Sequence, residues 1–120
     1  MGYFVDKEAS ILRVLSDPTR LRLAALLAAE GEMCVCRLVE AVGQPQYTVS
    51  RHLGQMRAAG LVEARRQGTW MYYTLVKPTC RLEQCLFDFL AGGLDSDMVA
   101  QGDRQRLRRA ECRNSERGIR

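Results

Sequence analysis

The chain has 120 residues, of which 47% are hydrophobic, and this length fits one domain with a modest core. No apolar run reaches the roughly 18 residues that a membrane span needs, and the N-terminus has no signal-peptide layout, so we expect a cytoplasmic protein with no membrane partner. The net charge of +4 lies entirely in the last twenty residues, so charge alone does not mark the body of the chain as a nucleic-acid binder.

Two helices are predicted in the first thirty residues. Residues 8–15 carry apolar side chains at helical spacing. Asp17 is a suitable N-cap for the next helix, and Pro18 suits its first position because the missing N–H has no partner there. This helix is rich in alanine and leucine and is expected to end at Gly31. Its composition predicts burial on much of its surface.

A pair of short helices around a tight turn follows. Residues 34–42 place apolar side chains at positions i, i+3, i+4 and i+7. After the turn GQPQ, residues 46–59 repeat an apolar stripe and carry polar side chains on the opposite face. This arrangement is typical of a helix-turn-helix, whose second helix enters the major groove of DNA and reads base edges.

The period changes to two after Gly60. Residues 61–76, LVEARRQGTWMYYTLV, read as two strands with a turn at Gln67–Gly68, and a last helix is predicted over about 80–91. The fold class is therefore mainly α with a β-hairpin wing, a winged helix-turn-helix in the order α-α-α-α-β-β-α. Arg65 and Arg66, near the tip of the hairpin, are placed for phosphate contacts.

The chain divides at about residue 92. Residues 101–120 hold seven arginines, three acidic residues and few large apolar ones. We therefore expect a domain over 1–92 and an arginine-rich, flexible tail over 93–120. The tail would either add nonspecific attraction to nucleic acid or simply aid solubility.

Four segments of the chain resemble the ArsR/SmtB family of metal-responsive repressors. They are LSDPTRLRLAALL at 15–27, CVCRL at 34–38, TVSRHLGQMRAAGLV at 48–62 and RRQGTWMYYTL at 65–75, and the resemblance covers about residues 6–91. It implies a homodimer formed through the first and last helices and an operator of double-stranded DNA with rough two-fold symmetry. It also implies that an inducer releases the DNA.

The resemblance assigns the DNA contacts to the second helix of the motif and to the wing. The expected residues are Gln46, Tyr47, Thr48, Ser50, Arg51, His52, Arg65 and Arg66. Arg51 is the strongest candidate, because arginine pairs bidentately with guanine or neutralises a phosphate. For His52, a structural or phosphate-contacting role is favoured over metal binding.

Cys34 and Cys36 are the candidate inducer ligands. In the arsenic-responsive branch of the family, thiols of this motif bind trivalent arsenic or antimony, and soft thiolates suit such ions. A helix N-terminus also favours the thiolate. In an ideal helix, positions i and i+2 lie about 200° apart. We therefore expect binding to unwind the first turn of this helix and to shift the DNA-reading helix packed against it.

Two departures from the arsenic pattern leave the third ligand open. Arg37 stands where the common motif has Asp, and Val39 stands where a third thiol is usual. A third sulfur would come from Cys80, Cys85, Cys112 or an external thiol, with Cys112 ranked first, and two-coordinate binding also remains open. Zinc or nickel sites on the last helix are not expected, because His52 is the only histidine.

The cysteine pattern also fits other roles. In one alternative, the pair consists of structural helix-edge residues without chemistry. A repressor of the same fold could instead sense oxidants or reactive sulfur by forming a disulfide, with Cys85 or Cys112 as the less strained partner. A thiol enzyme such as an arsenate reductase is the remote alternative, since the chain lacks an oxyanion loop and a recognisable Cys/His pair.

Overall fold

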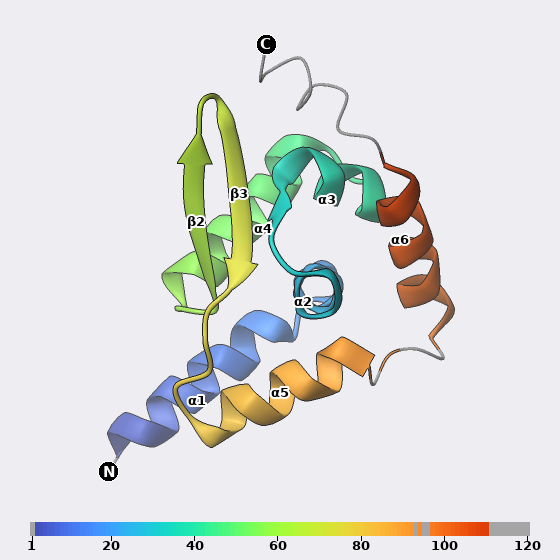
Figure 1. The fold of residues 1–120 in the computed structure, drawn as a ribbon. Coiled ribbons are helices and arrows are strands. Elements are labelled where there is room, and N and C mark those ends of the chain that lie inside the picture. Colours follow the sequence, from blue (N-terminus) through green and yellow to red (C-terminus); the bar gives the residue numbers. More distant parts are fainter. Residues whose placement is uncertain (1, 93, 95–96, 111–120) are drawn as a thin grey trace.

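The computed structural model describes residues 2–92, 94 and 97–110. The elements in chain order are α1 (Gly2–Leu15), α2 (Pro18–Glu30), β1 (Met33–Cys34), α3 (Val35–Val42), α4 (Gln46–Ala58), β2 (Val62–Gln67), β3 (Trp70–Leu75), α5 (Arg81–Gly92) and α6 (Met98–Arg109). Helix α2 lies at the centre, with the β2–β3 wing on one side, α6 on the other, and α1 and α5 at one end (Figure 1). Within these ranges, no helix is long and apolar enough to cross a membrane.

The central helix α2 begins and ends as the sequence predicts. Asp17 accepts hydrogen bonds from the backbone N–H groups of Thr19 at 2.8 Å and Arg20 at 3.1 Å. Burial raises the pKa of Asp17, but these hydrogen bonds and electrostatic interactions with His52 and Arg20 outweigh burial and hold that pKa below its ordinary value. Gly31 ends the helix with a φ of 85°, which favours glycine. Leu23, Leu26 and Leu27 of α2 are buried in the core.

The helix-turn-helix is confirmed at α3 and α4. Leu38 and Val42 of α3 are buried, and Gly43 ends that helix in the left-handed conformation. Val49, Leu53 and Met56 of α4 are fully buried, as their spacing predicts. The opposite face of α4 is therefore available for another molecule.

The wing has a third strand that the sequence did not predict. Strands β2 and β3 pair antiparallel from Val62↔Leu75 to Gln67↔Trp70, and β1 pairs with the other edge of β3, so the order is β1-β3-β2. Met33 lies opposite Tyr73, and Cys34 lies opposite Tyr72. Residue 34 is thus in a strand, and the helix expected from 34 begins at Val35.

Helix α6 corrects the prediction that a flexible tail follows residue 92. Residues 98–109 are helical and pack against α3 and α2. Leu107 is fully buried, Ala100 is buried, and Asp97 caps the helix by accepting a hydrogen bond from the Ala100 N–H at 2.9 Å. The composition misled because two apolar residues at positions i and i+7, Ala100 and Leu107, are enough to anchor the helix, although Met98 and Val99 are exposed. The remainder of the predicted tail, 111–120, lies outside the described residues.

Helices α1 and α5 carry apolar side chains that the chain itself does not cover. On α5, Leu90 is buried and Leu82 and Leu86 are half-buried, whereas Phe89 is 50% exposed. Val5 and Leu12 on α1 are 63% and 50% exposed. The two helices lie at the same end of the molecule (Figure 1). This end therefore presents an apolar surface.

Candidate thiol site and nucleic-acid interface

Cys34 and Cys36, here called the thiol pair, lie where β1 runs into α3. The two Sγ atoms are 2.8 Å apart. Cys34 is the N-cap of α3, with an extended backbone at φ −76° and ψ 155°, and it is only 3% exposed, whereas Cys36 is half-buried. The prediction that the sulfurs point to opposite sides of a helix is wrong, because Cys34 precedes the helix. No unwinding is needed to bring the two sulfurs together.

The chemistry of this donor set fits a soft, thiophilic ligand. Two thiols in contact offer two sulfur donors side by side, and thiolates prefer soft ions. The site lies at the N-terminal end of α3, where the helix dipole favours negative charge. Cys34 makes no side-chain cap with the first turn of α3. The half-buried Cys36 gives access from solvent.

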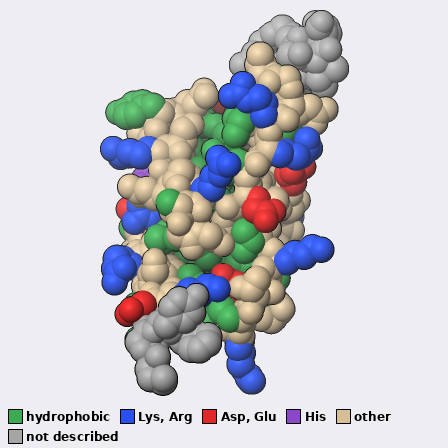
Figure 2. Space-filling view, turned by 90° about the vertical axis from the view of Figure 1, so that its left-hand side faces the viewer, with side chains coloured by type: hydrophobic (Ala, Val, Ile, Leu, Met, Phe, Trp, Pro, Cys, Tyr) green, Lys and Arg blue, Asp and Glu red, His purple; other side chains and the backbone are tan. Residues whose placement is uncertain are grey.

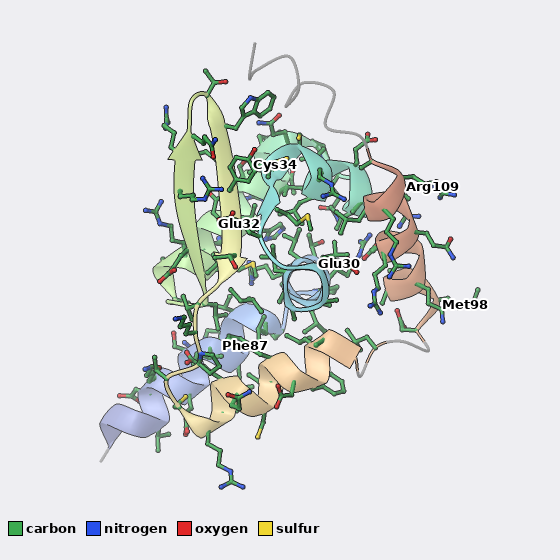
Figure 3. All side chains as sticks on the ribbon, viewed as in Figure 1. Glu30, Glu32, Cys34, Phe87, Met98 and Arg109 are labelled. Atoms are coloured by element: carbon green, nitrogen blue, oxygen red, sulfur yellow. The ribbon has the colours of Figure 1, made fainter. Side chains whose placement is uncertain are left out.

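The structure does not bring Cys80 or Cys85 to the thiol pair. Among the residues placed in the structure, no group of three or more His, Cys, Asp or Glu side chains is arranged to hold a metal ion. Cys80 immediately precedes α5 and Cys85 lies within it. Helix α5, with Phe87 labelled, is at the end of the molecule away from Cys34 (Figure 3). The geometry therefore disfavours the alternatives in which Cys80 or Cys85 of the same chain supplies a third ligand, and Cys112, which was ranked first, lies outside the described residues.

Arg37 connects the start of α3 to the end of α6. Its Nη2 donates to the Leu107 carbonyl at 3.0 Å. Its Nε is buried without a hydrogen-bond partner in the described part of the chain. The residue that replaces the Asp of the common motif thus holds the C-terminal end of α6 beside the turn that carries Cys36.

The other end of α3 is fixed by two arginines that share one carboxylate. Arg22 Nη2 donates to the Val42 carbonyl at 3.1 Å, and Arg106 Nε donates to the Ala41 carbonyl at 2.7 Å. Asp103, only 1% exposed, accepts from Arg22 at 2.8 Å through both of its oxygens and from Arg106 Nη2 at 2.8 Å. The hydrogen bonds that Arg22 donates to Asp103 raise the pKa of Arg22, which stays charged. We call Arg22, Asp103 and Arg106 the Asp103 network.

Glu32, two residues before Cys34, is paired with the wing. Arg65 donates to its two carboxylate oxygens through Nε at 2.9 Å and Nη2 at 2.8 Å. The third nitrogen, Nη1, donates to Gln67 Oε1 at 2.7 Å, and the guanidinium lies 4.7 Å above the ring of Tyr72. The hydrogen bonds from Arg65 hold the pKa of Glu32 below its ordinary value. In Figure 3, Glu32 and Cys34 lie beside β3 near the start of α3.

The predicted DNA-reading residues of α4 have different exposures. Gln46, Tyr47 and Arg51 are exposed, and Tyr47 is 73% exposed. Thr48 and Ser50 are half-buried. The backbone of α4 therefore presents Gln46, Tyr47 and Arg51 most directly to a partner, and Arg51 keeps its place as the strongest candidate for base or phosphate contact.

His52 and the two wing arginines have distinct surroundings. His52 faces α2, with its Nδ1 3.2 Å from Nη1 of Arg20, which also donates to Gln55 Oε1. This contact agrees with a structural role for the histidine. Arg65 is occupied by Glu32, whereas Arg66 is exposed and makes no ion pair with any residue placed in the structure. Lys and Arg side chains are spread over the face on this side of the molecule (Figure 2).

Comparisons with known proteins agree with this geometry. Residues 17–64 match the family model "Bacterial regulatory protein, arsR family". The chain is 48% identical over 65 residues to an arsenic resistance transcriptional regulator of Pseudomonas putida, an alignment that covers 54% of this chain and 51% of that protein. It is 39% identical over 87 residues to a putative arsenical resistance operon repressor of Halobacterium salinarum, covering 69% of this chain and 73% of the relative.

A solved structure is similar over most of the chain. It is the homodimeric winged helix-turn-helix DNA-binding domain of a possible ArsR-family transcriptional regulator from Mycobacterium bovis. The TM-score is 0.64 at 29% sequence identity, over 79% of this chain and 82% of that one. The order of helices and the wing described above are thus those of a winged helix-turn-helix regulator.

Proposed function

The chain belongs to the arsR family of bacterial regulatory proteins and is a transcriptional repressor rather than an enzyme, and we propose that it releases its operator when trivalent arsenic or antimony binds the thiol pair. The observation that carries this proposal is the 2.8 Å contact between the sulfurs of Cys34 and Cys36. Two close thiols are a suitable ligand set for a thiophilic ion. They differ from a zinc or nickel site that is built from histidine and carboxylate ligands. The names of the two relatives, both linked to arsenic resistance, support the same inducer class.

The DNA interface of the proposed repressor combines α4 with the wing. Helix α4 enters the major groove, and Gln46, Tyr47 and Arg51 reach base edges or phosphates from its exposed face. Thr48, Ser50 and His52 support the same helix from half-buried positions. Arg66 extends the contact to the backbone from the wing.

A homodimer would present two such interfaces to a two-fold-symmetric operator. The uncovered apolar side chains of α1 and α5, among them Leu12 and Phe89, are candidates for the dimer contact. Burying them against a second copy removes apolar surface from water, which favours association. The homodimeric relative of known structure supports this assembly.

A third sulfur ligand for the proposed site comes from Cys112. Arg37 holds the Leu107 carbonyl beside the start of α3, and Cys112 follows Leu107 by five residues. Helix α6 ends at Arg109, and the three residues from there to Cys112 span at most about 11 Å when extended, which is the reach that the thiol needs in this proposal. When bound, the metalloid supplies a soft centre that holds the sulfurs in one fixed geometry.

Release follows because the thiol pair belongs to elements that touch the DNA-binding parts. Helix α3 packs on α4, and β1 pairs with β3 of the wing. A ligand that prefers a different arrangement of Cys34 and Cys36 shifts the population toward a conformation with lower operator affinity. The effect is reciprocal, so operator DNA should also weaken ligand binding.

Operator binding under full reduction tests the proposal. We expect arsenite to weaken binding measured by fluorescence anisotropy for the wild type. Cys34→Ser and Cys36→Ser should bind DNA but keep their affinity when arsenite is added. Cys85→Ser, an exposed thiol on α5, is the matched control and should respond like the wild type. Arsenite release of the Cys34 and Cys36 variants at wild-type concentrations would show that another site is the sensor.

Arg51 is tested by the same assay without inducer. Arg51→Ala should weaken operator binding by about 1–3 kcal/mol, because a bidentate contact to a base is lost. Arg81→Ala, an exposed arginine at the start of α5, should leave the affinity unchanged. Equal affinities for Arg51→Ala and wild type would remove Arg51 from the interface.

The same sulfur contact supports a second candidate, a repressor that senses oxidants or reactive sulfur. Oxidation of Cys34 and Cys36 to a disulfide would pass two electrons and two protons to the oxidant. Cys85 is no longer a suitable partner because α5 lies away from the pair. This candidate predicts release by peroxide or persulfide and no release by arsenite in excess reductant.

A further inference from the structure

Three of the five N–H donors of the Arg65 guanidinium are engaged in this conformation. Its Nε and Nη2 atoms donate to Glu32, its Nη1 donates to Gln67, and its face covers the ring of Tyr72. A phosphate contact through the Nε side of the guanidinium would therefore have to displace Glu32. Arg66, the next residue, has its side chain on the other face of the strand and is exposed. The two neighbouring arginines of the wing are therefore not equivalent.

The partners of Arg65 are the residues that frame the thiol pair. Glu32 precedes Cys34 by two residues, and Tyr72 lies directly opposite Cys34 in the β1–β3 ladder. Arg65 itself lies opposite Tyr72 in the β2–β3 ladder. One ion pair and two strand pairings thus connect the turn before the thiol pair to both strands of the wing.

The far end of α3 offers no comparable freedom to move. The Asp103 network holds the Ala41 and Val42 carbonyls, and its carboxylate is buried. The start of α3 has no comparable buried network: Cys34 makes no side-chain cap, and the Arg37 hydrogen bond to the Leu107 carbonyl ties this end to α6. A change of geometry at the thiol pair is therefore accommodated most easily by β1 and by the strands that β1 contacts.

We propose that Glu32 and Arg65 are positioning residues that carry the state of the thiol pair to the wing, and that Arg66 rather than Arg65 makes the phosphate contact. The proposal rests on the proposed function in one respect, namely that the thiol pair is the sensor. In the ligand-free protein, the Glu32–Arg65 ion pair holds the wing in the position that binds DNA. A shift of β1 moves Glu32, and the wing follows because Arg65 is attached to it.

Two matched pairs of variants test the proposal in the full-length protein. Glu32→Gln removes the ion pair, and Glu63→Gln makes the same charge change on β2 at an exposed residue without an ion pair in the described ranges. Arg65→Gln and Arg66→Gln compare the two wing arginines. Thermal unfolding followed by circular dichroism checks that each variant folds, which their exposed positions favour.

The first measurement is the ratio of operator dissociation constants with and without arsenite. We expect Glu32→Gln to bind the operator more weakly than the wild type without arsenite, because the wing is no longer held, and to reduce this ratio at least about fivefold, the lower range of allosteric coupling. Glu63→Gln should keep the wild-type ratio. A Glu32→Gln ratio equal to that of the wild type would overturn the coupling role of the ion pair.

The second measurement uses no inducer. The logarithm of the association constant decreases with the logarithm of the salt concentration. The magnitude of this slope should be smaller by about one per half-site for Arg66→Gln, because one phosphate contact is lost. Arg65→Gln should keep the wild-type slope. If the magnitude of the slope decreases for Arg65→Gln instead, Arg65 contacts a phosphate and the proposal is wrong.

The third measurement separates failure of this inference from failure of the proposed function. Arsenite should protect Cys34 and Cys36 from a thiol reagent in both wild type and Glu32→Gln, since the ion pair does not hold the ligand. Loss of protection in the wild type would overturn the proposed function and the inference together. Protection in both proteins with equal release ratios would overturn the inference alone. The fluorescence of Trp70, the only tryptophan and a residue of β3, should change on arsenite addition in the wild type and less in Glu32→Gln.

Discussion

The two ends of α3 are held in opposite ways. At its C-terminal end, Arg22 and Arg106 donate to the last carbonyls, and both are bound to the buried carboxylate of Asp103. At its N-terminal end, Cys34 occupies the N-cap position without a side-chain cap, and its sulfur instead contacts that of Cys36. An eight-residue helix is thus fixed by a buried ion-pair network at one end, and its other end, which the Arg37 hydrogen bond ties to α6, is the more adjustable one.

This difference indicates where a conformational change can begin and which elements it can reach. An inducer that binds at the adjustable end changes the junction of β1 and α3, because charge-assisted hydrogen bonds resist movement at the fixed end. The wing is directly attached to that junction through β1 and Glu32. The thiol pair lies at the end of α3 where a small rearrangement has the lower free-energy cost.

The largest expected effect on stability comes from disrupting the Asp103 network at the C-terminal end of α3. Asp103→Ala leaves Arg22 and Arg106 without their shared partner and should lower the free energy of unfolding by about 3 kcal/mol, because a buried ion pair loses one member. Urea denaturation measures the loss. Asp88→Asn, an exposed residue on α5 whose carboxylate accepts a hydrogen bond from Gln84, is the control with a small effect. A loss below about 1 kcal/mol would mean that the Asp103 network does not fix α3.

A smaller effect is expected when the start of α2 is made to resemble the start of α3. Asp17→Ala removes a side-chain cap and should cost about 1 kcal/mol of stability near neutral pH. Because folding lowers the pKa of Asp17, its contribution is present above the unfolded value of 3.8 and is lost as the pH falls through the lower folded value. Denaturation at pH 6 and pH 3 should show the difference between variant and wild type shrinking at acid pH. A difference that grows at acid pH would contradict this role.

The smallest effect is expected when the start of α3 is given a cap. Cys34→Ser places a preferred N-cap residue at this position and should raise the free energy of unfolding by less than about 1 kcal/mol. Cys36→Ser, inside the first turn, should not gain stability. Parallel urea titrations compare the two. If Cys34→Ser is the less stable variant, a serine at residue 34 does not cap the start of α3.

The sequence predicted the helices and the hairpin because their signals are local. Asp17, Pro18 and Gly31 delimit α2, and the apolar stripes of α3 and α4 have one clear period. Strand β1 was missed because two residues cannot establish a period of their own. Helix α6 was missed because its stability depends on Asp103 meeting Arg22, which is 81 residues away in the chain.

The candidate site was predicted in its residues but not in its geometry. The spacing of Cys34 and Cys36 identified the thiol pair, yet the helix assumed for residue 34 placed the sulfurs apart. The extended backbone that joins them arises from pairing with Tyr72, a contact distant in sequence. For the same reason, the pairing of Arg65 with Glu32 could not be read from a wing motif alone.

Hydrogen exchange of the full-length repressor with and without arsenite tests the central claim most directly. The account predicts altered exchange in residues 33–36 and in β3, with the amides near Val42 and those of α6 unchanged. A response confined to α4 or to the C-terminal half of α3, with β1 and β3 exchanging as before, would contradict it.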